Sequence, residues 1–69
     1  MTVDTQELRA RMAYHSLSQR EIADAIGTTR ATFNLKLQTG DFKISEVHKL
    51  MACIPLSMQE VEKIFFADK

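Results

Sequence analysis

The chain has 69 residues, of which 45% are hydrophobic, and its nine basic and nine acidic side chains cancel to a net charge of zero. A chain this short holds one small core and leaves little room for an enclosed catalytic cavity, so we expect a single domain over residues 1–69 and no enzyme. The apolar content argues against disorder, no apolar run approaches the roughly 18 residues of a membrane span, and no signal-peptide pattern is present, which together predict a cytoplasmic protein.

Cysteine and histidine are too few to form a metal site or a disulfide. Cys53 has no second cysteine to pair with, and His15 and His48 are far apart in the sequence. We therefore expect no metal and no cofactor, and we interpret Cys53 as a small core residue rather than a reactive thiol.

The first helix is predicted over about residues 4–15. Asp4 is a candidate N-cap, and Glu7 stands three residues later, where it would complete a capping box. The apolar positions that would face the core are Leu8, Met12 and Ala13.

Two further helices follow with a very short connection between them. Ser18 and Glu21 form a second capping box, which starts a helix that ends before Gly27. Gly27 supplies the left-handed residue that closes a helix, and Thr29 can cap the next helix over about residues 30–38. The apolar positions of the two helices are Ile22, Ala23, Ile26, Phe33 and Leu37.

The remaining residues predict two more helices. One starts near Ile44 and is stopped by Pro55, and Ser57 with Glu60 forms a capping box that opens the last helix. Their apolar positions are Ile44, Val47, Leu50, Met51, Ile54, Val61, Ile64 and Phe65. Five short helices and no strand predict an all-α fold.

The short turn at Gly27 indicates a helix-turn-helix unit, whose second helix enters the major groove in proteins that bind DNA. The residues of this unit resemble the phage Cro and CI-type repressor family of XRE-like regulators. They are Ser18-Gln-Arg-Glu-Ile-Ala23, Ile26, Gly27, Thr29 and Phe33. The resemblance covers about residues 6–66 and implies a compact five-helix, lambda-repressor-like DNA-binding domain. The segments that look most like small Cro-like regulators of temperate phages of Gram-positive bacteria are Asn34-Leu-Lys-Leu37, Phe42, Ile44-Ser-Glu-Val47 and Ile64-Phe-Phe66.

The resemblance implies a sequence-specific transcriptional regulator that binds a double-stranded DNA operator. The implied base-reading residues are Thr29, Arg30, Ala31 and Asn34. Arginine can bond a guanine twice, asparagine an adenine, and the Ala and Thr methyls can touch a thymine methyl. The implied phosphate contacts, which set register and salt dependence, are Gln19, Arg20, Lys36, Thr39 and Lys43. Alternatively, Arg30 and Asn34 belong to an ordinary solvated helix face.

One recognition helix reads too few base pairs for useful specificity, so we expect a homodimer. Phe66 should reach the rim of the last helix and form a two-fold contact with Met58 or Val61, unless it folds back against Leu8.

The small excess of basic side chains and the apolar Leu35 leave a second function open. Residues 9–43 carry six basic and three acidic side chains, but acidic flanks offset this excess. Leu35 departs from the family pattern, because it places an apolar side chain on a helix face that should be exposed to solvent. There it would contact either a base methyl group or a protein. An antirepressor that covers a partner repressor's DNA-binding surface would suit both features.

Overall fold

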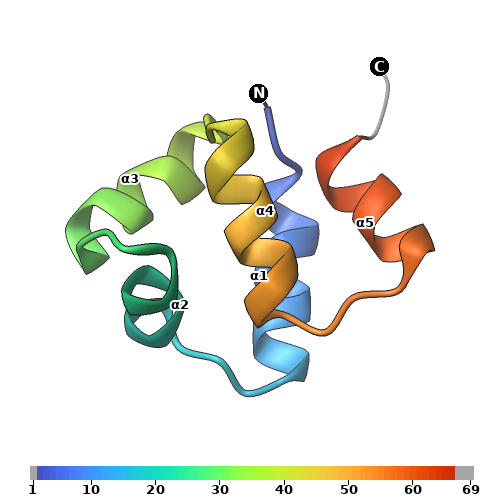
Figure 1. Ribbon diagram of the computed structural model, residues 1–69, viewed down its shortest axis with the longest axis horizontal. Helices are drawn as coiled ribbons and strands as arrows, with labels where there is room; N and C mark the ends of the chain where they lie inside the picture. The colour runs from blue at the N-terminus through green and yellow to red at the C-terminus, as the bar shows by residue number, and fades with distance from the viewer. Residues whose placement is uncertain (1, 67–69) are drawn as a thin grey trace.

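Five helices form in the computed structural model, which describes residues 2–66 of the chain (Figure 1). They are α1 (Thr5–Tyr14), α2 (Gln19–Ile26), α3 (Arg30–Thr39), α4 (Ile44–Cys53) and α5 (Met58–Phe65). Within residues 2–66 the only strand-like pairing is one isolated antiparallel bridge between Thr2 and Asp41. The predicted all-α fold of five helices is confirmed. The helices α2 and α3 lie together at one end of the molecule, α5 lies at the other, and α1 and α4 run between them.

The predicted capping boxes of α2 and α5 are confirmed. Ser18 Oγ accepts the N–H of Glu21 at 3.1 Å, and Glu21 Oε1 accepts the N–H of Ser18 at 2.9 Å. Ser57 and Glu60 make the same reciprocal pair at 3.2 and 2.9 Å. Each box satisfies two backbone N–H groups that have no partner inside the helix, which explains why both helices begin at these residues.

The cap of α1 is only half of the predicted box. Asp4 Oδ1 accepts the N–H of Glu7 at 3.2 Å, but the N–H of Asp4 donates to the carbonyl of Ile64 at 2.8 Å. Glu7 Oε1 instead lies 3.6 Å from Lys63 Nζ. The predicted return bond from Glu7 is therefore wrong, because α5 packs beside α1 and supplies both an acceptor and a cation.

Two glycines end α2 and α3 in the left-handed conformation. Gly27 has φ of +78° and Gly40 has φ of +76°, which residues with a Cβ rarely adopt. Gly40 is also approached closely by the N-terminal segment: its carbonyl accepts the Val3 N–H at 2.8 Å, and a Cβ at Gly40 would lie 3.0 Å from Val3 O. The segment before α1 is thereby tied to the end of α3.

Side chains from all five helices and from the connecting segments form one core. Its buried members are Val3, Leu8, Met12, Ile22, Ala23, Ile26, Phe33, Leu37, Phe42, Val47, Leu50, Ile54, Val61, Ile64 and Phe65. Phe33 is fully buried and meets Phe42 edge to face, with ring centroids 6.1 Å apart. All predicted core positions of α2, α3 and α5 are buried. The shared core therefore fixes the position of α2 relative to α3.

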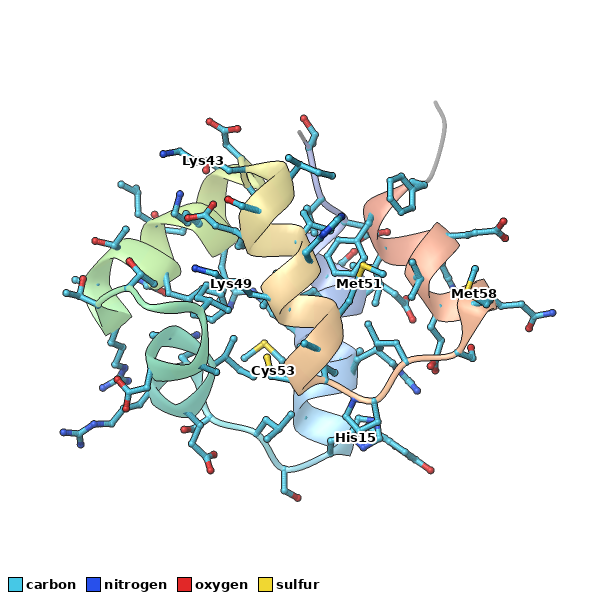
Figure 2. All side chains as sticks on the ribbon, viewed as in Figure 1. His15, Lys43, Lys49, Met51, Cys53 and Met58 are labelled. Atoms are coloured by element: carbon cyan, nitrogen blue, oxygen red, sulfur yellow. The ribbon has the colours of Figure 1, made fainter. Side chains whose placement is uncertain are left out.

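Three predicted core positions lie on the surface instead. Ala13 is exposed, and so are Ile44 and Met51 on α4. The buried stripe of α4 is centred on Val47 and Leu50. Ile44 lies three residues before Val47, and Met51 directly follows Leu50, so both fall at the edge of this stripe. Figure 2 shows Met51 on the side of α4 that is turned toward α5. The spacing of apolar residues was a correct sign of a helix but overstated the width of its buried face.

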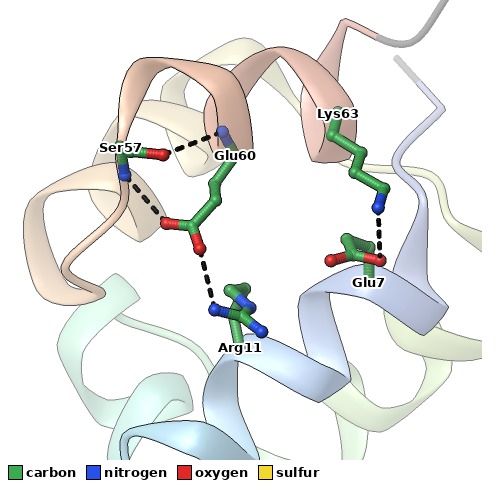
Figure 3. A network of polar contacts seen from close by, with 5 residues as sticks. All are labelled: Glu7, Arg11, Ser57, Glu60 and Lys63. Carbon is green, nitrogen blue, oxygen red and sulfur yellow. Dashed lines mark hydrogen bonds and ion pairs between the residues drawn. The ribbon is translucent and has the colours of Figure 1, made fainter.

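Ion pairs join α1 to α5 at the surface (Figure 3). Arg11 Nη1 lies 2.7 Å from Glu60 Oε2, and Lys63 Nζ lies 3.6 Å from Glu7 Oε1. The hydrogen bond from the Ser57 N–H, helped by the Arg11 guanidinium, lowers the pKa of Glu60 below its ordinary value. Glu60 thus both caps α5 and attaches it to α1.

Candidate nucleic-acid interface

A shallow hollow opens between α2 and α3 at the end of the molecule away from α5. Four side chains line it: Gln19, Arg30, Ala31 and Asn34. Gln19 is the first residue of α2 and Arg30 is the first residue of α3, so the N-terminal ends of both helices meet here. The short connection, closed by the left-handed Gly27, returns the chain so that these two ends share one surface. Three predicted base-reading residues and one predicted phosphate contact are therefore brought together.

The periodicity of α3 explains which side chains reach this hollow. Phe33 and Leu37 are fully buried and fix one stripe of α3 against the core. Successive residues turn by about 100° around a helix, so Arg30, Ala31 and Asn34 fall on a different face from that stripe. Together they offer a guanidinium with five donors, a methyl group, and an amide that donates and accepts. This is the set of groups that can match the edges of base pairs.

Thr29 is committed to capping α3. Its Oγ1 accepts the Thr32 N–H at 3.2 Å and donates to Thr32 Oγ1 at 2.9 Å. The predicted cap is confirmed, and the hydroxyl is already engaged on both its donor and its acceptor side. The methyl group of Thr29, which is the group predicted to touch a thymine, takes no part in these hydrogen bonds.

Lys36 is tied to α4 rather than extended into solvent. Its Nζ lies 3.2 Å from Glu46 Oε1, and both side chains are about four-fifths buried. The same Glu46 oxygen accepts the Lys43 N–H at 2.8 Å. Partial burial raises the pKa of Glu46, but the Lys43 N–H and the Lys36 ammonium outweigh this and hold the pKa below its ordinary value. The positive charge of Lys36 is therefore largely compensated within the protein.

The other predicted phosphate contacts differ in how available they are. Arg20 and Lys43 are exposed, and Figure 2 shows Lys43 where α3 meets α4. The Thr39 hydroxyl donates to the Lys36 carbonyl at 3.4 Å and accepts the Asp41 N–H at 3.3 Å. Arg20 and Lys43 are thus the predicted cations that are exposed enough to approach a phosphate beside this surface, although the charge of Lys43 also acts on Glu46.

Three residues of α5 and its end were predicted to contact a second protomer. Met58 is 75% exposed and Phe66 is 53% exposed, so Phe66 reaches the rim as its position predicts. Val61 is buried in the core and presents almost no surface to a partner. The exposed Ile44 and Met51 were not anticipated on any surface, and no local sequence signal separates them from the buried residues of α4.

None of Cys53, His15 and His48 lines the hollow between α2 and α3. Cys53 packs against the core, its Sγ donates to the Leu50 carbonyl at 3.5 Å, and burial raises the pKa of its thiol. His15 is half-buried beside Tyr14, and His48 is exposed. Across residues 2–66, no three or more His, Cys, Asp or Glu side chains are grouped so that they could hold a metal ion.

Comparison with protein-family models, with curated proteins and with solved structures found no match to this chain. In the part of the chain that the structure describes, no helix combines the length and apolarity needed to cross a membrane.

Proposed function

We propose that this protein is a sequence-specific DNA-binding regulator of the Cro and CI repressor kind, with α3 as its recognition helix. The observation that carries the proposal is the common hollow lined by Gln19, Arg30, Ala31 and Asn34. Their positions in the sequence match a helix-turn-helix pattern, and in the folded chain they line one hollow. Their arrangement suits α3 lying in the major groove, with Gln19 at the phosphate backbone beside it.

The charges around this surface support the proposal. Residues 30–39 of α3 contain no acidic side chain, and Arg20, Arg30 and Lys43 are exposed. The N-termini of α2 and α3 both lie at the hollow. Ser18 and Thr29 cap one N–H group of each helix, and the helix dipoles still favour an anion such as phosphate here.

The proposed regulator acts as a homodimer in the cytoplasm. One α3 covers too few base pairs for useful specificity, whereas two copies would read half-sites about 34 Å apart. Phe66 and Met58 are the predicted contact residues that remain exposed, so they are the ones we assign to the two-fold interface.

A second candidate is an antirepressor that binds the DNA-reading surface of a partner repressor. The observation that favours it is charge. The chain is neutral overall, and the ion pair with Glu46 compensates the positive charge of Lys36. Binding to a protein partner would require less positive charge on this chain than binding to the phosphates of DNA does.

A titration separates the two candidates. The protein is added to labelled duplexes from the DNA that flanks its own gene and to a duplex of random sequence, at low and at moderate salt. The proposal expects preferential binding to a flanking duplex that weakens steeply with salt. Binding to neither duplex at low salt would rule out the DNA-binding function and favour the antirepressor.

A further inference from the structure

Leu35 is a large apolar side chain in the middle of α3, and it is 59% exposed. We propose that Leu35 reads the C5-methyl group of a thymine in the major groove. The inference rests on the proposed function, and it adds to that function a residue that selects a particular base.

The direction of Leu35 follows from its neighbours on the helix. Phe33 and Leu37, two residues before and after it, are both fully buried. Each lies about 200° around the helix from Leu35, so the side chain of Leu35 points directly away from the core. A helix that lies in a groove with its core side outward would present Leu35 to the floor of that groove.

The surroundings of Leu35 favour a base over a protein surface. The residues one turn before and after it on the same side of α3 are Ala31, Thr32, Gln38 and Thr39, all of them exposed. Protein contact sites are typically larger continuous apolar patches, whereas Leu35 is the one exposed large apolar residue of α3. A single apolar side chain among small and polar ones matches the thymine methyl, the one apolar group on base edges in the major groove.

The spacing along α3 places this contact relative to the hollow. Ala31, which lines the hollow, stands four residues before Leu35 and so lies one turn earlier on a similar face. One helical turn rises about 5.4 Å and successive base pairs are about 3.4 Å apart. The thymine read by Leu35 should therefore lie one or two base pairs from the base beside Ala31.

The test pairs a side-chain deletion with a methyl deletion. The preferred duplex is first selected from random sequences by the wild-type protein, and each thymine in it is then replaced by deoxyuridine, which lacks only the methyl group. We expect wild type to lose about fourfold in affinity at one thymine of each half-site, the effect of one buried methyl group. Leu35→Ala should bind the thymine and deoxyuridine duplexes equally at that position, while thymines near Ala31 keep their effect.

Ile44→Ala is the matched control. Ile44 is 56% exposed on α4, so this variant removes similar apolar surface outside α3. It should show the same change in affinity as wild type when each thymine is replaced by deoxyuridine. The inference is overturned if every thymine of the selected duplex can be replaced by deoxyuridine without loss of affinity. It is also overturned if Leu35→Ala loses as much affinity as wild type when the thymine is replaced. Neither result contradicts the proposed DNA-binding function. Loss of self-association in Leu35→Ala with unchanged duplex preference would also overturn it and make Leu35 a protein contact. If wild type selects no duplex, the proposed function fails and the inference falls with it.

Discussion

The ammonium of Lys36 lies 3.2 Å from Glu46 Oε1, so a cation of α3 is neutralised by the first turn of α4. In Glu46→Gln the charge of Lys36 would be uncompensated beside the proposed DNA surface. We expect this variant to bind every duplex more tightly at low salt and to steepen the slope of log affinity against log salt by up to about 0.9, the effect of one additional phosphate contact. Fluorescence anisotropy across a salt series measures both.

Glu62→Gln is the control for this change. It removes one carboxylate from α5, at the opposite end of the molecule from α3, and should leave the salt slope near that of wild type (Figure 1). Equal slopes in Glu46→Gln and wild type would show that Lys36 does not approach DNA even when it is released.

Arg30 and Lys43 should affect DNA binding in different ways. Arg30→Ala removes a proposed contact to a base and should weaken binding to the preferred duplex by about 1–3 kcal/mol, with a relaxed preference at one base pair. Lys43→Ala removes a proposed phosphate contact, so it should weaken all sequences alike and reduce the salt slope by about one. Titrations against preferred and random duplexes distinguish these outcomes. An Arg30→Ala variant that weakens both duplexes equally would mean that Arg30 does not read a base.

The two left-handed glycines should differ in how well they tolerate alanine. Gly27→Ala meets no atom within 4 Å and should cost only the strain of the left-handed conformation, about 1–2 kcal/mol. Gly40→Ala has the same strain, and its Cβ would also press on the carbonyl of Val3 at 3.0 Å. We therefore expect Gly40→Ala to be the less stable variant in urea denaturation. The reverse order would contradict the close approach of the N-terminal segment to α3.

Phe33 supports α3, the proposed recognition helix, from inside the core. Phe33→Ala leaves a cavity beside Phe42 and should cost about 3–5 kcal/mol, a large part of the stability of so small a domain. Phe66→Ala removes the same ring from a half-exposed site and should cost much less. Thermal melting followed by circular dichroism compares them, and a shift of only a few degrees for Phe33→Ala would mean that Phe33 is not a core residue.

Acid should weaken the attachment of α5 through Glu60. Its pKa is lowered in the folded protein by the Ser57 N–H and the Arg11 guanidinium. The stability that Glu60 contributes is thus complete above its ordinary pKa and is lost as the pH falls through the lowered value. In Glu60→Gln, which cannot ionise, the midpoint of thermal melting should fall less than in wild type between pH 6 and pH 3, as melting curves over that range would show. Identical pH dependence in the two proteins would exclude this role.

Local signals predicted much of the fold, because caps and turns are decided by residues close in the sequence. Ser18 with Glu21, and Ser57 with Glu60, bond each other across three residues, and Gly27 adopts its left-handed conformation within the same turn. These features follow from side-chain chemistry and backbone sterics, which act before any tertiary contact forms.

Features that depend on a second helix were not predictable in this way. The N–H of Asp4 donates to Ile64, sixty residues later, and Lys36 pairs with Glu46 across the junction of α3 and α4. The exposure of Ile44 likewise depends on which side of α4 its neighbours cover. In the candidate site, helix periodicity could place Arg30 and Asn34 on one face, but the approach of Gln19 to them required the packed arrangement of α2 and α3.

Binding of DNA at the surface between α2 and α3 can be measured residue by residue through amide chemical-shift mapping of the isotope-labelled protein. The labelled chain is titrated with its preferred duplex, and the same titration is repeated with a random duplex. The largest changes are expected at the residues that line the hollow, Gln19, Arg30, Ala31 and Asn34, with small changes along α5 except where a dimer forms. Changes that are absent, or that spare α2 and α3 while they concentrate on α1 and α5, would contradict the account.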